Sequence, residues 1–208
     1  MPKPKLRQRF FAWLLKKGES VNERIYRSIK QELFKDLSGL VVEIGPGTGI
    51  NFNYFPRNID WIGLEPNEAF HDIILQKASE KDIKARLIKS VAEKIDLPDE
   101  SADAVISTLV LCSVRDLQAS LQEIKRVLKK EGKLFIIEHV AALPGSMLRK
   151  TQKVFNPVNR LIADGCNCNR ETWKDIEFAG FSSVHIHHER IKGTIFLHAP
   201  HIIGFAIK

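Results

Sequence analysis

The chain has 208 residues, enough for one α/β domain with a well-buried core, and its 44% hydrophobic and 27% charged residues are typical of a globular protein. Its formal net charge of +7 is concentrated in residues 1–17, which hold basic residues and no acid, while the rest of the chain is nearly neutral. This distribution argues against a nucleic-acid-binding protein, and the apolar run Phe10–Leu15 is too short to cross a bilayer, which needs about 20 residues.

The N-terminal segment combines these basic residues with the apolar and aromatic run Phe10–Leu15. A basic, aromatic helix suits an anionic membrane surface, and the same pattern also fits a solvated helix packed on the domain. Both interpretations stay open, the first with peripheral membrane contact through residues 3–17. Apolar residues spaced by four predict a further helix over residues 20–35. We expect a helical extension over residues 1–35 and the main domain over residues 36–208.

Predicted strands and helices alternate along the rest of the chain. This order predicts an α/β fold with a doubly wound, Rossmann-like sheet of seven strands, mostly parallel with an antiparallel edge strand, and with helices on both faces. The predicted strands cover residues 40–44, 60–65, 85–91, 102–108, 133–138, 185–190 and 202–207, and the predicted helices cover residues 67–80, 117–130 and 146–163, the last interrupted near Pro157.

The first of these strands runs directly into three glycines at alternate positions, in the stretch Val41–Gly49. Glycines allow the backbone to turn tightly and to approach a ligand closely. The loop is not a P-loop, because no Gly-Lys-Ser/Thr follows it, and its third glycine does not fit the dinucleotide fingerprint. Pro56 also ends any following helix too early to hold a pyrophosphate. The loop therefore favours a ligand without phosphate.

The pattern Glu-x-Gly-x-Gly-x-Gly resembles the first motif of class I S-adenosylmethionine-dependent methyltransferases, and later stretches resemble further motifs of that family in the expected order. The resemblance implies an enzyme with S-adenosyl-L-methionine as cofactor and S-adenosyl-L-homocysteine as product. In that family the glycine loop lies beneath the methionine portion of the cofactor, and an acid at the end of the second strand binds its ribose. Residues after the third strand lie beside its adenine ring. By resemblance the cofactor-binding residues are Glu43, Gly45, Pro46, Gly47, Thr48, Gly49, Asn51, Glu65, Pro66, Asn67, Val91, Ala92, Glu93, Thr108 and Leu109.

Beyond the fourth strand the chain resembles one subgroup, the membrane-associated alkyl-thiol S-methyltransferases. The resemblance lies in Thr108–Val114, Glu138–Ala142, Asp164–Asn167 with Arg170–Trp173, and Pro200–Lys208. It implies a small, lipophilic alkyl thiol as acceptor, and it fails at the front, where those proteins carry a long apolar anchor. The alternatives are methylation of a lipid amine or a quinone-type carbon, and a non-catalytic cofactor-binding scaffold.

A thiol acceptor reacts as its thiolate, so the enzyme needs a base or a positive field. His139 follows the fifth strand on the ligand-binding edge of the sheet and is the candidate catalytic base. Asp164 is the candidate to orient or replace it, and Cys112 and Cys166 are candidates to line the acceptor pocket. The alternatives are a structural role for His139 and a small buried hydrophobe at Cys112.

The remaining motifs do not favour a metal or a secreted protein. Cys166 and Cys168 are one residue apart, which makes a poor chelate, so we expect no metal. Three cysteines give no paired disulfide framework, which favours a cytoplasmic protein, peripheral at a membrane surface if the N-terminal segment binds one. The apolar residues of Met147–Leu161 are expected to form a lid over the acceptor pocket.

Overall fold

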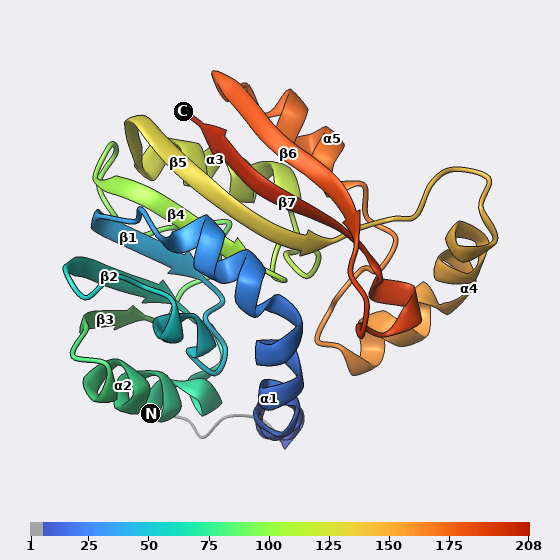
Figure 1. Cartoon of the computed structure of the whole chain (residues 1–208), viewed down its shortest axis with the longest axis horizontal. Coiled ribbons are helices and arrows are strands. Elements are labelled where there is room, and N and C mark those ends of the chain that lie inside the picture. Colours follow the sequence, from blue (N-terminus) through green and yellow to red (C-terminus); the bar gives the residue numbers. More distant parts are fainter. Residues whose placement is uncertain (1–5) are drawn as a thin grey trace.

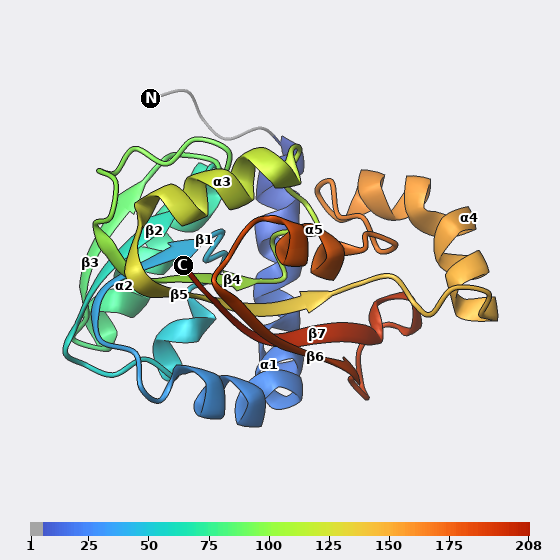
Figure 2. The same ribbon diagram turned by 90° about the horizontal axis from the view of Figure 1, so that it is seen from above.

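The computed structural model describes residues 6–208, except the side chain of Arg7, so Lys3 and Lys5 of the predicted membrane segment lie outside the described residues. A seven-stranded sheet forms the centre of the molecule, and helices cover both of its faces (Figures 1 and 2). Its strands are β1 (Gly39–Ile44), β2 (Ile59–Leu64), β3 (Lys84–Ile88), β4 (Ala102–Thr108), β5 (Leu128–His139), β6 (Ser183–Arg190) and β7 (Pro200–Ile207). The helices are α1 (Leu6–Phe34), α2 (His71–Glu80), α3 (Leu117–Val127), α4 (Met147–Ile162) and α5 (Thr172–Phe178), with short 3₁₀ helices η1 (Ile50–Asn53), η2 (Glu68–Phe70) and η3 (Phe196–His198).

The strand order is β3-β2-β1-β4-β5-β7-β6, which confirms the predicted fold class. Strands β1 to β5 pair in parallel, and β7 runs antiparallel between β5 and the edge strand β6. The chain moves outward from β1 to β2 and β3, and then crosses back to β4 on the other side of β1. Ligands of such sheets bind beyond the carboxyl ends of the strands at this reversal, so the ends of β1 and β4 mark the expected site.

Two apolar layers hold the helices to the sheet. On one face Leu121 and Ile124 of α3 are fully buried, and Asp116 caps that helix by accepting a hydrogen bond from the Ala119 N–H. On the other face Tyr26 and Phe34 of α1 are buried beside η1 and α2. Each face is therefore closed by amphipathic helices, which leaves the strand ends as the place for a ligand.

Three elements differ from the sequence-based expectations. Helix α1 is continuous from Leu6 to Phe34, because its single interior glycine, Gly18, costs only about 1 kcal/mol of helix stability. Helix α4 continues through Pro157, whose ring removes one backbone donor without ending the helix. Helix α5 is absent from the sequence-based prediction. The division of the chain at residue 36 stays a prediction, since α1 contributes Tyr26 and Phe34 to the core. Within residues 6–208, no helix combines the length and apolar character that crossing a membrane requires.

Candidate functional site

The glycine loop after β1 holds three left-handed residues, with φ of 57° at Gly45, 56° at Gly47 and 69° at Gly49. Side chains disfavour this conformation, so glycine is the natural residue at each position. A Cβ atom at Gly45 would lie 2.8 Å from Val110 Cγ2, whereas one at Gly47 would meet no atom closer than 3.9 Å. Gly45 is thus required by packing, and the space beside Gly47 is open to a ligand.

Glu43, the acid that precedes the glycines, ties the loop to the sheet. Its Oε1 accepts a hydrogen bond from Asn51 Nδ2 at 2.7 Å, and its Oε2 accepts one from Trp61 Nε1 at 2.9 Å. Complete burial raises the pKa of Glu43 to about 7. Asn51 is thereby fixed with its Oδ1 buried and without a hydrogen-bond partner among residues 6–208. Such an orphaned acceptor is suited to an N–H group of a ligand.

Glu65, at the end of β2, bridges two loops. Its Oε2 accepts a hydrogen bond from the Gly47 N–H at 3.2 Å, and its Oε1 accepts one from the Asn67 N–H at 2.8 Å. Burial raises the pKa of Glu65 to about 7, and the charge of Asp164 contributes in the same direction. Pro66 beside it is exposed. The carboxylate therefore lies against the glycine loop, where the sequence predicts a ribose-binding acid.

The first turns of α1 pack against the glycine loop and the segment after β2. The sequence did not indicate this contact. Asn67 Nδ2 donates to the Gln8 carbonyl oxygen at 3.1 Å, and the Phe11 ring packs edge-on against Phe70 with centroids 6.4 Å apart. Leu15 Cδ1 lies 3.9 Å from the position of a Cβ atom at Gly47. The N-terminal helix is therefore part of the candidate cofactor site.

The predicted adenine border after β3 has mixed exposure. Val91 is exposed, Ala92 is buried, and Glu93 Oε1 accepts hydrogen bonds from the Arg115 N–H at 2.7 Å and the Asp116 N–H at 3.2 Å. Glu93 thus connects this loop to the start of α3. Its role beside an adenine ring stays a prediction.

The end of β4 meets the glycine loop. Thr108 Oγ1 accepts a hydrogen bond from Asn51 Nδ2 at 3.2 Å. Leu109 follows in a left-handed conformation with φ of 60°, held by its N–H, which donates to the Ile137 carbonyl oxygen at 2.8 Å. A leucine in this region is strained, and such strain persists where the surrounding structure enforces it, often at functional sites.

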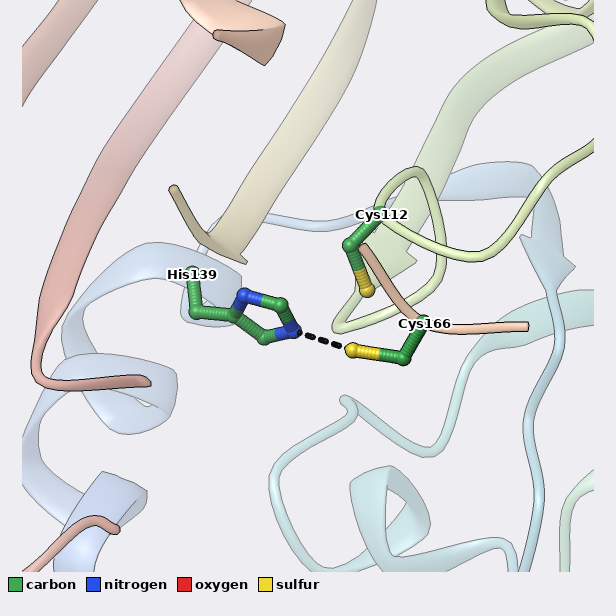
Figure 3. Close-up of side chains that lie close together, drawn as sticks. All are labelled: Cys112, His139 and Cys166. Carbon is green, nitrogen blue, oxygen red and sulfur yellow. Dashed lines mark hydrogen bonds between the residues drawn. The ribbon is translucent and has the colours of Figure 1, made fainter. Parts of the chain in front are cut away.

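Cys112, His139 and Cys166, which we name the thiol–imidazole cluster, converge beyond the ends of β4 and β5 (Figure 3). Their three ligand atoms all lie within 4.8 Å of one another, and Cys166 Sγ is 3.0 Å from His139 Nε2. All three residues are buried. The sequence places these residues at one site but does not predict that they touch.

A tight turn after α4 brings Cys166 into the cluster. Asp164 and Gly165 both have positive φ, 47° and 92°, which reverses the chain. The Asn167 N–H then donates to the Cys112 carbonyl oxygen at 2.9 Å and joins the two loops. Asp164 lies within electrostatic reach of Glu65, on the cofactor side of this turn.

The thiols and the imidazole polarise one another. Hydrogen bonds from Cys112 and His139 lower the pKa of Cys166, whereas the bond to Cys166 and burial raise the pKa of Cys112. His139 Nδ1 is buried and has no hydrogen-bond partner within the described chain, so Asp164 does not hold that nitrogen. The predicted roles of His139 as base and of Asp164 as its helper stay predictions.

Glu138 is a site residue whose importance the sequence did not reveal. Its Oε1 accepts three hydrogen bonds, from Ser107 Oγ at 2.6 Å, the Val110 N–H at 2.8 Å and the Leu111 N–H at 2.9 Å. The residue is fully buried, which raises its pKa. Glu138 therefore fixes the loop that carries Cys112. The sequence did contain one indication of this role, since Glu138 is an acid at the end of an otherwise apolar strand.

The expected lid over the acceptor pocket is wrong for most of the apolar residues of α4, which face outward, while Leu148 is half-buried. Their exposed fractions exceed half, and they are Met147, Val154, Phe155, Val158 and Leu161. The buried residues of the helix are Gln152 and Asn159, which are polar. Gln152 Nε2 donates to the carbonyl oxygens of Val140 and Leu197, so this helix attaches to the domain through amide hydrogen bonds.

Comparison with known proteins places this geometry in a family. Residues 42–136 match the family described as a methyltransferase domain. The rat (Rattus norvegicus) thiol S-methyltransferase TMT1B is 37% identical over 210 residues, covering 96% of this chain and 86% of the relative. The human (Homo sapiens) thiol S-methyltransferase TMT1A is 32% identical, covering 97% of this chain and 87% of the relative. These matches extend well beyond the cofactor motifs into the segments around the thiol–imidazole cluster.

Solved structures share the fold. A Thermotoga maritima protein, described as an S-adenosylmethionine-dependent methyltransferase and possible histamine N-methyltransferase, is similar with a TM-score of 0.71 and 21% identity, covering 97% of this chain and 98% of its own. At this identity the likeness supports the architecture alone.

Proposed function

The chain belongs to the methyltransferase domain family and is a relative of the thiol S-methyltransferases, and from this membership we propose that it methylates the sulfur of a small, lipophilic thiol. The family implies S-adenosylmethionine as the methyl donor. When bound, this donor supplies a methyl group on a positively charged sulfur.

The glycine loop fits that donor on three observations. The space beside Gly47 is open, Asn51 presents a buried acceptor without a partner in the described part of the chain, and Glu65 carries a carboxylate against the loop. We assign Asn51 to the donor's amino group and Glu65 to its ribose hydroxyls. Loss of either acceptor would remove a charged or bidentate hydrogen bond, the stronger kind.

The observation that carries the thiol acceptor is the position of the thiol–imidazole cluster. Cys112 lies in the loop that continues from Leu109, directly beyond the predicted position of the donor's methionine portion. His139 and Cys166 face it from the end of β5 and from the turn after α4 (Figure 3). A protonated imidazole close to an acceptor thiol stabilises the thiolate, which is the form that reacts.

The proposed reaction balances as a displacement. The acceptor thiol releases its proton to the solvent, and its sulfur lone pair forms a bond to the methyl carbon. The bond between that carbon and the donor sulfur breaks, and its electron pair stays on the donor sulfur, which gives a thioether and S-adenosylhomocysteine. The chain's own contribution is to align the two sulfur atoms and to exclude water.

The test offers the purified protein S-adenosylmethionine together with alkyl thiols, lipid amines or quinols, and detects products by mass spectrometry. We expect S-methyl thioethers from the thiols and no product from the other two classes. Methylation of a lipid amine or a quinol without any thioether would overturn the proposed acceptor. Gly47→Leu protein, which should not bind the donor, is the blank for non-enzymatic methylation.

We further propose that the protein contacts an anionic membrane surface, from which a lipophilic acceptor would reach the site. Helix α1 exposes Phe10 and Trp13 together with basic residues. Helix α4, which projects beyond the end of β5 (Figure 1), exposes Val154, Phe155 and Leu161 and contains basic residues and no acid. Apolar side chains with a surrounding of positive charge suit the interface of an anionic bilayer.

Sedimentation with vesicles tests this contact. We expect binding to vesicles with anionic lipid, weaker binding at high salt, and little binding to neutral vesicles. Phe155→Ser with Leu161→Ser should weaken binding several-fold and leave binding of S-adenosylhomocysteine unchanged. Equal binding of this double variant and the wild type would exclude α4 from the contact.

A further inference from the structure

We propose that the thiol–imidazole cluster is a zinc site, in which Cys112 Sγ, Cys166 Sγ and His139 Nε2 hold Zn²⁺ and leave a fourth position for the sulfur of the acceptor. Metal binding is argued from the cluster itself, and the use of the fourth position rests on the proposed thiol S-methyltransferase function. No sequence motif indicates this set, because its members come from three separate segments and lack the spacing of a zinc motif.

The geometry is close to that of a tetrahedral zinc centre. Zinc–sulfur bonds of about 2.3 Å and zinc–nitrogen bonds of about 2.0 Å place two sulfur atoms about 3.8 Å apart and a sulfur and a nitrogen about 3.5 Å apart. In the protein the three ligand atoms lie within 4.8 Å of one another, with Cys166 Sγ 3.0 Å from His139 Nε2 (Figure 3). Changes of about 1.3 Å or less in these separations would therefore complete the site.

The donor atoms select zinc among the common divalent ions. Two thiolates and one imidazole are soft and borderline ligands, which calcium and magnesium avoid. Two thiolates with one histidine also form a known kind of catalytic zinc site, in which the fourth position is open. Because all three side chains are buried, deprotonated thiols need a compensating cation, and Zn²⁺ supplies it.

The surroundings hold the ligands in place. Asn159 Nδ2 donates to the Cys166 carbonyl oxygen at 2.8 Å and lies 3.3 Å from Cys166 Sγ, and Ser113 Oγ lies 3.4 Å from Cys112 Sγ. The His198 ring stacks on His139 with centroids 4.4 Å apart and fixes the plane of the imidazole. Hydrogen bonds and packing of this kind orient the ligands of metal sites.

The fourth position gives the metal a role in the reaction. An acceptor thiol that binds there releases its proton to the solvent, because a coordinated thiol is deprotonated at neutral pH. Its sulfur then forms the bond to the methyl carbon as the donor's carbon–sulfur bond breaks. The thioether product is neutral and is a weaker ligand than the thiolate, so it leaves the metal.

Metal content tests the site independently of activity. The protein is equilibrated with Zn²⁺, passed through a desalting column and assayed for zinc by mass spectrometry. We expect about one zinc per chain in the wild type, and at least about 100-fold weaker zinc binding in Cys166→Ser, since loss of a direct ligand should exceed the effect of losing a surrounding hydrogen bond. Cys168→Ser is the matched control, because Cys168 is equally buried but bonds Gln152 and Asn156 outside the cluster.

Cobalt tests the fourth position. Co²⁺ bound in place of zinc should show an absorption band from thiolate ligands, and an added alkyl thiol should change that band. Absence of stoichiometric zinc, or equal losses in Cys166→Ser and Cys168→Ser, would overturn the metal site. A cobalt spectrum that does not respond to thiol would overturn the open fourth position.

Thiol methylation that persists in metal-free protein would overturn the metal's role and leave the proposed function standing. Zinc binding without methylation of any thiol would leave the metal site standing and remove the proposed function.

Discussion

The two halves of the candidate ligand-binding edge are built by different means. The half around the glycine loop uses neighbouring residues in the sequence and many backbone groups, such as the N–H groups of Gly47 and Asn67, which donate to Glu65. The half around the thiol–imidazole cluster uses side chains from the loop after β4, the end of β5 and the turn after α4. The first half depends on local backbone shape, and the second depends on the whole fold.

The largest expected effect comes from a substitution that disrupts only the half around the glycine loop. Replacing Gly47 by leucine puts a side chain into the open space beside the loop and forces it into a left-handed conformation. We expect the affinity for S-adenosylhomocysteine to fall at least about 100-fold, equivalent to about 2.7 kcal/mol of binding free energy. Calorimetric titration measures it. Zinc binding at the thiol–imidazole cluster should be unchanged.

Gly145 provides the matched control for backbone strain. It also has a positive φ, 81°, and a Cβ atom added there would have no other atom within 4 Å. It lies in the segment between β5 and α4, away from the glycine loop. Gly145→Leu should therefore cost similar strain and leave the affinity for S-adenosylhomocysteine intact. If Gly145→Leu and Gly47→Leu weakened binding equally, the loop would not be the cofactor site.

This contrast explains how much the sequence could predict. The glycine loop, Glu43 and Glu65 lie within one β–loop–β unit, so the resemblance of this short stretch to a family motif indicated a shared site. The contact between Cys166 and His139 depends on the turn at Asp164 and Gly165 after α4, which no local pattern encodes. Helix α4 misled the prediction because its buried side is polar, with Gln152 and Asn159, and its exposed side is apolar. A rule that places apolar residues inside therefore assigned its faces the wrong way round.

The next substitution disrupts the half around the thiol–imidazole cluster and should leave the half around the glycine loop intact. Glu138→Ala removes the acceptor of the Ser107 hydroxyl and of the Val110 and Leu111 N–H groups. Because these donors are buried, we expect the free energy of unfolding to fall by about 2–4 kcal/mol. Chemical denaturation measures the loss. Thiol turnover should fall further than stability explains, since the loop that carries Cys112 is released.

Glu138→Gln is the conservative partner of that variant. The amide keeps one oxygen acceptor of similar shape, so it should recover at least half of the lost stability. A Glu138→Ala protein with normal stability and normal thiol turnover would show that the loop after β4 is held by other contacts.

The smallest expected effect is a pH dependence of stability that arises in the half around the glycine loop. Burial of Glu65 there raises its pKa, so this acid titrates near neutral pH. The folded-state pKa of Glu65 is about 7, raised from its ordinary value of 4.5, so between these values the folded protein holds a proton that the unfolded chain has released. Stability from this group is therefore present below pH 4.5, is lost as the pH rises, and is fully lost above pH 7.

Glu65→Gln cannot titrate, so the melting temperature of the variant minus that of the wild type should rise between pH 4.5 and 7 and then level off. We expect a change of several degrees, corresponding to at most about 3 kcal/mol for this pKa shift, measured by thermal unfolding at constant ionic strength. Other groups, such as His201, whose pKa burial lowers to about 4, are present in both proteins and cancel in the difference. A difference that does not vary with pH would mean that Glu65 is ionised in the folded protein throughout. The acid would then already be in the charged form that accepts ribose hydroxyls, and the affinity for S-adenosylhomocysteine would stay constant between pH 4.5 and 7. If Glu65 is instead protonated in the free protein and the ligand requires the ionised carboxylate, the affinity should rise with pH across this range.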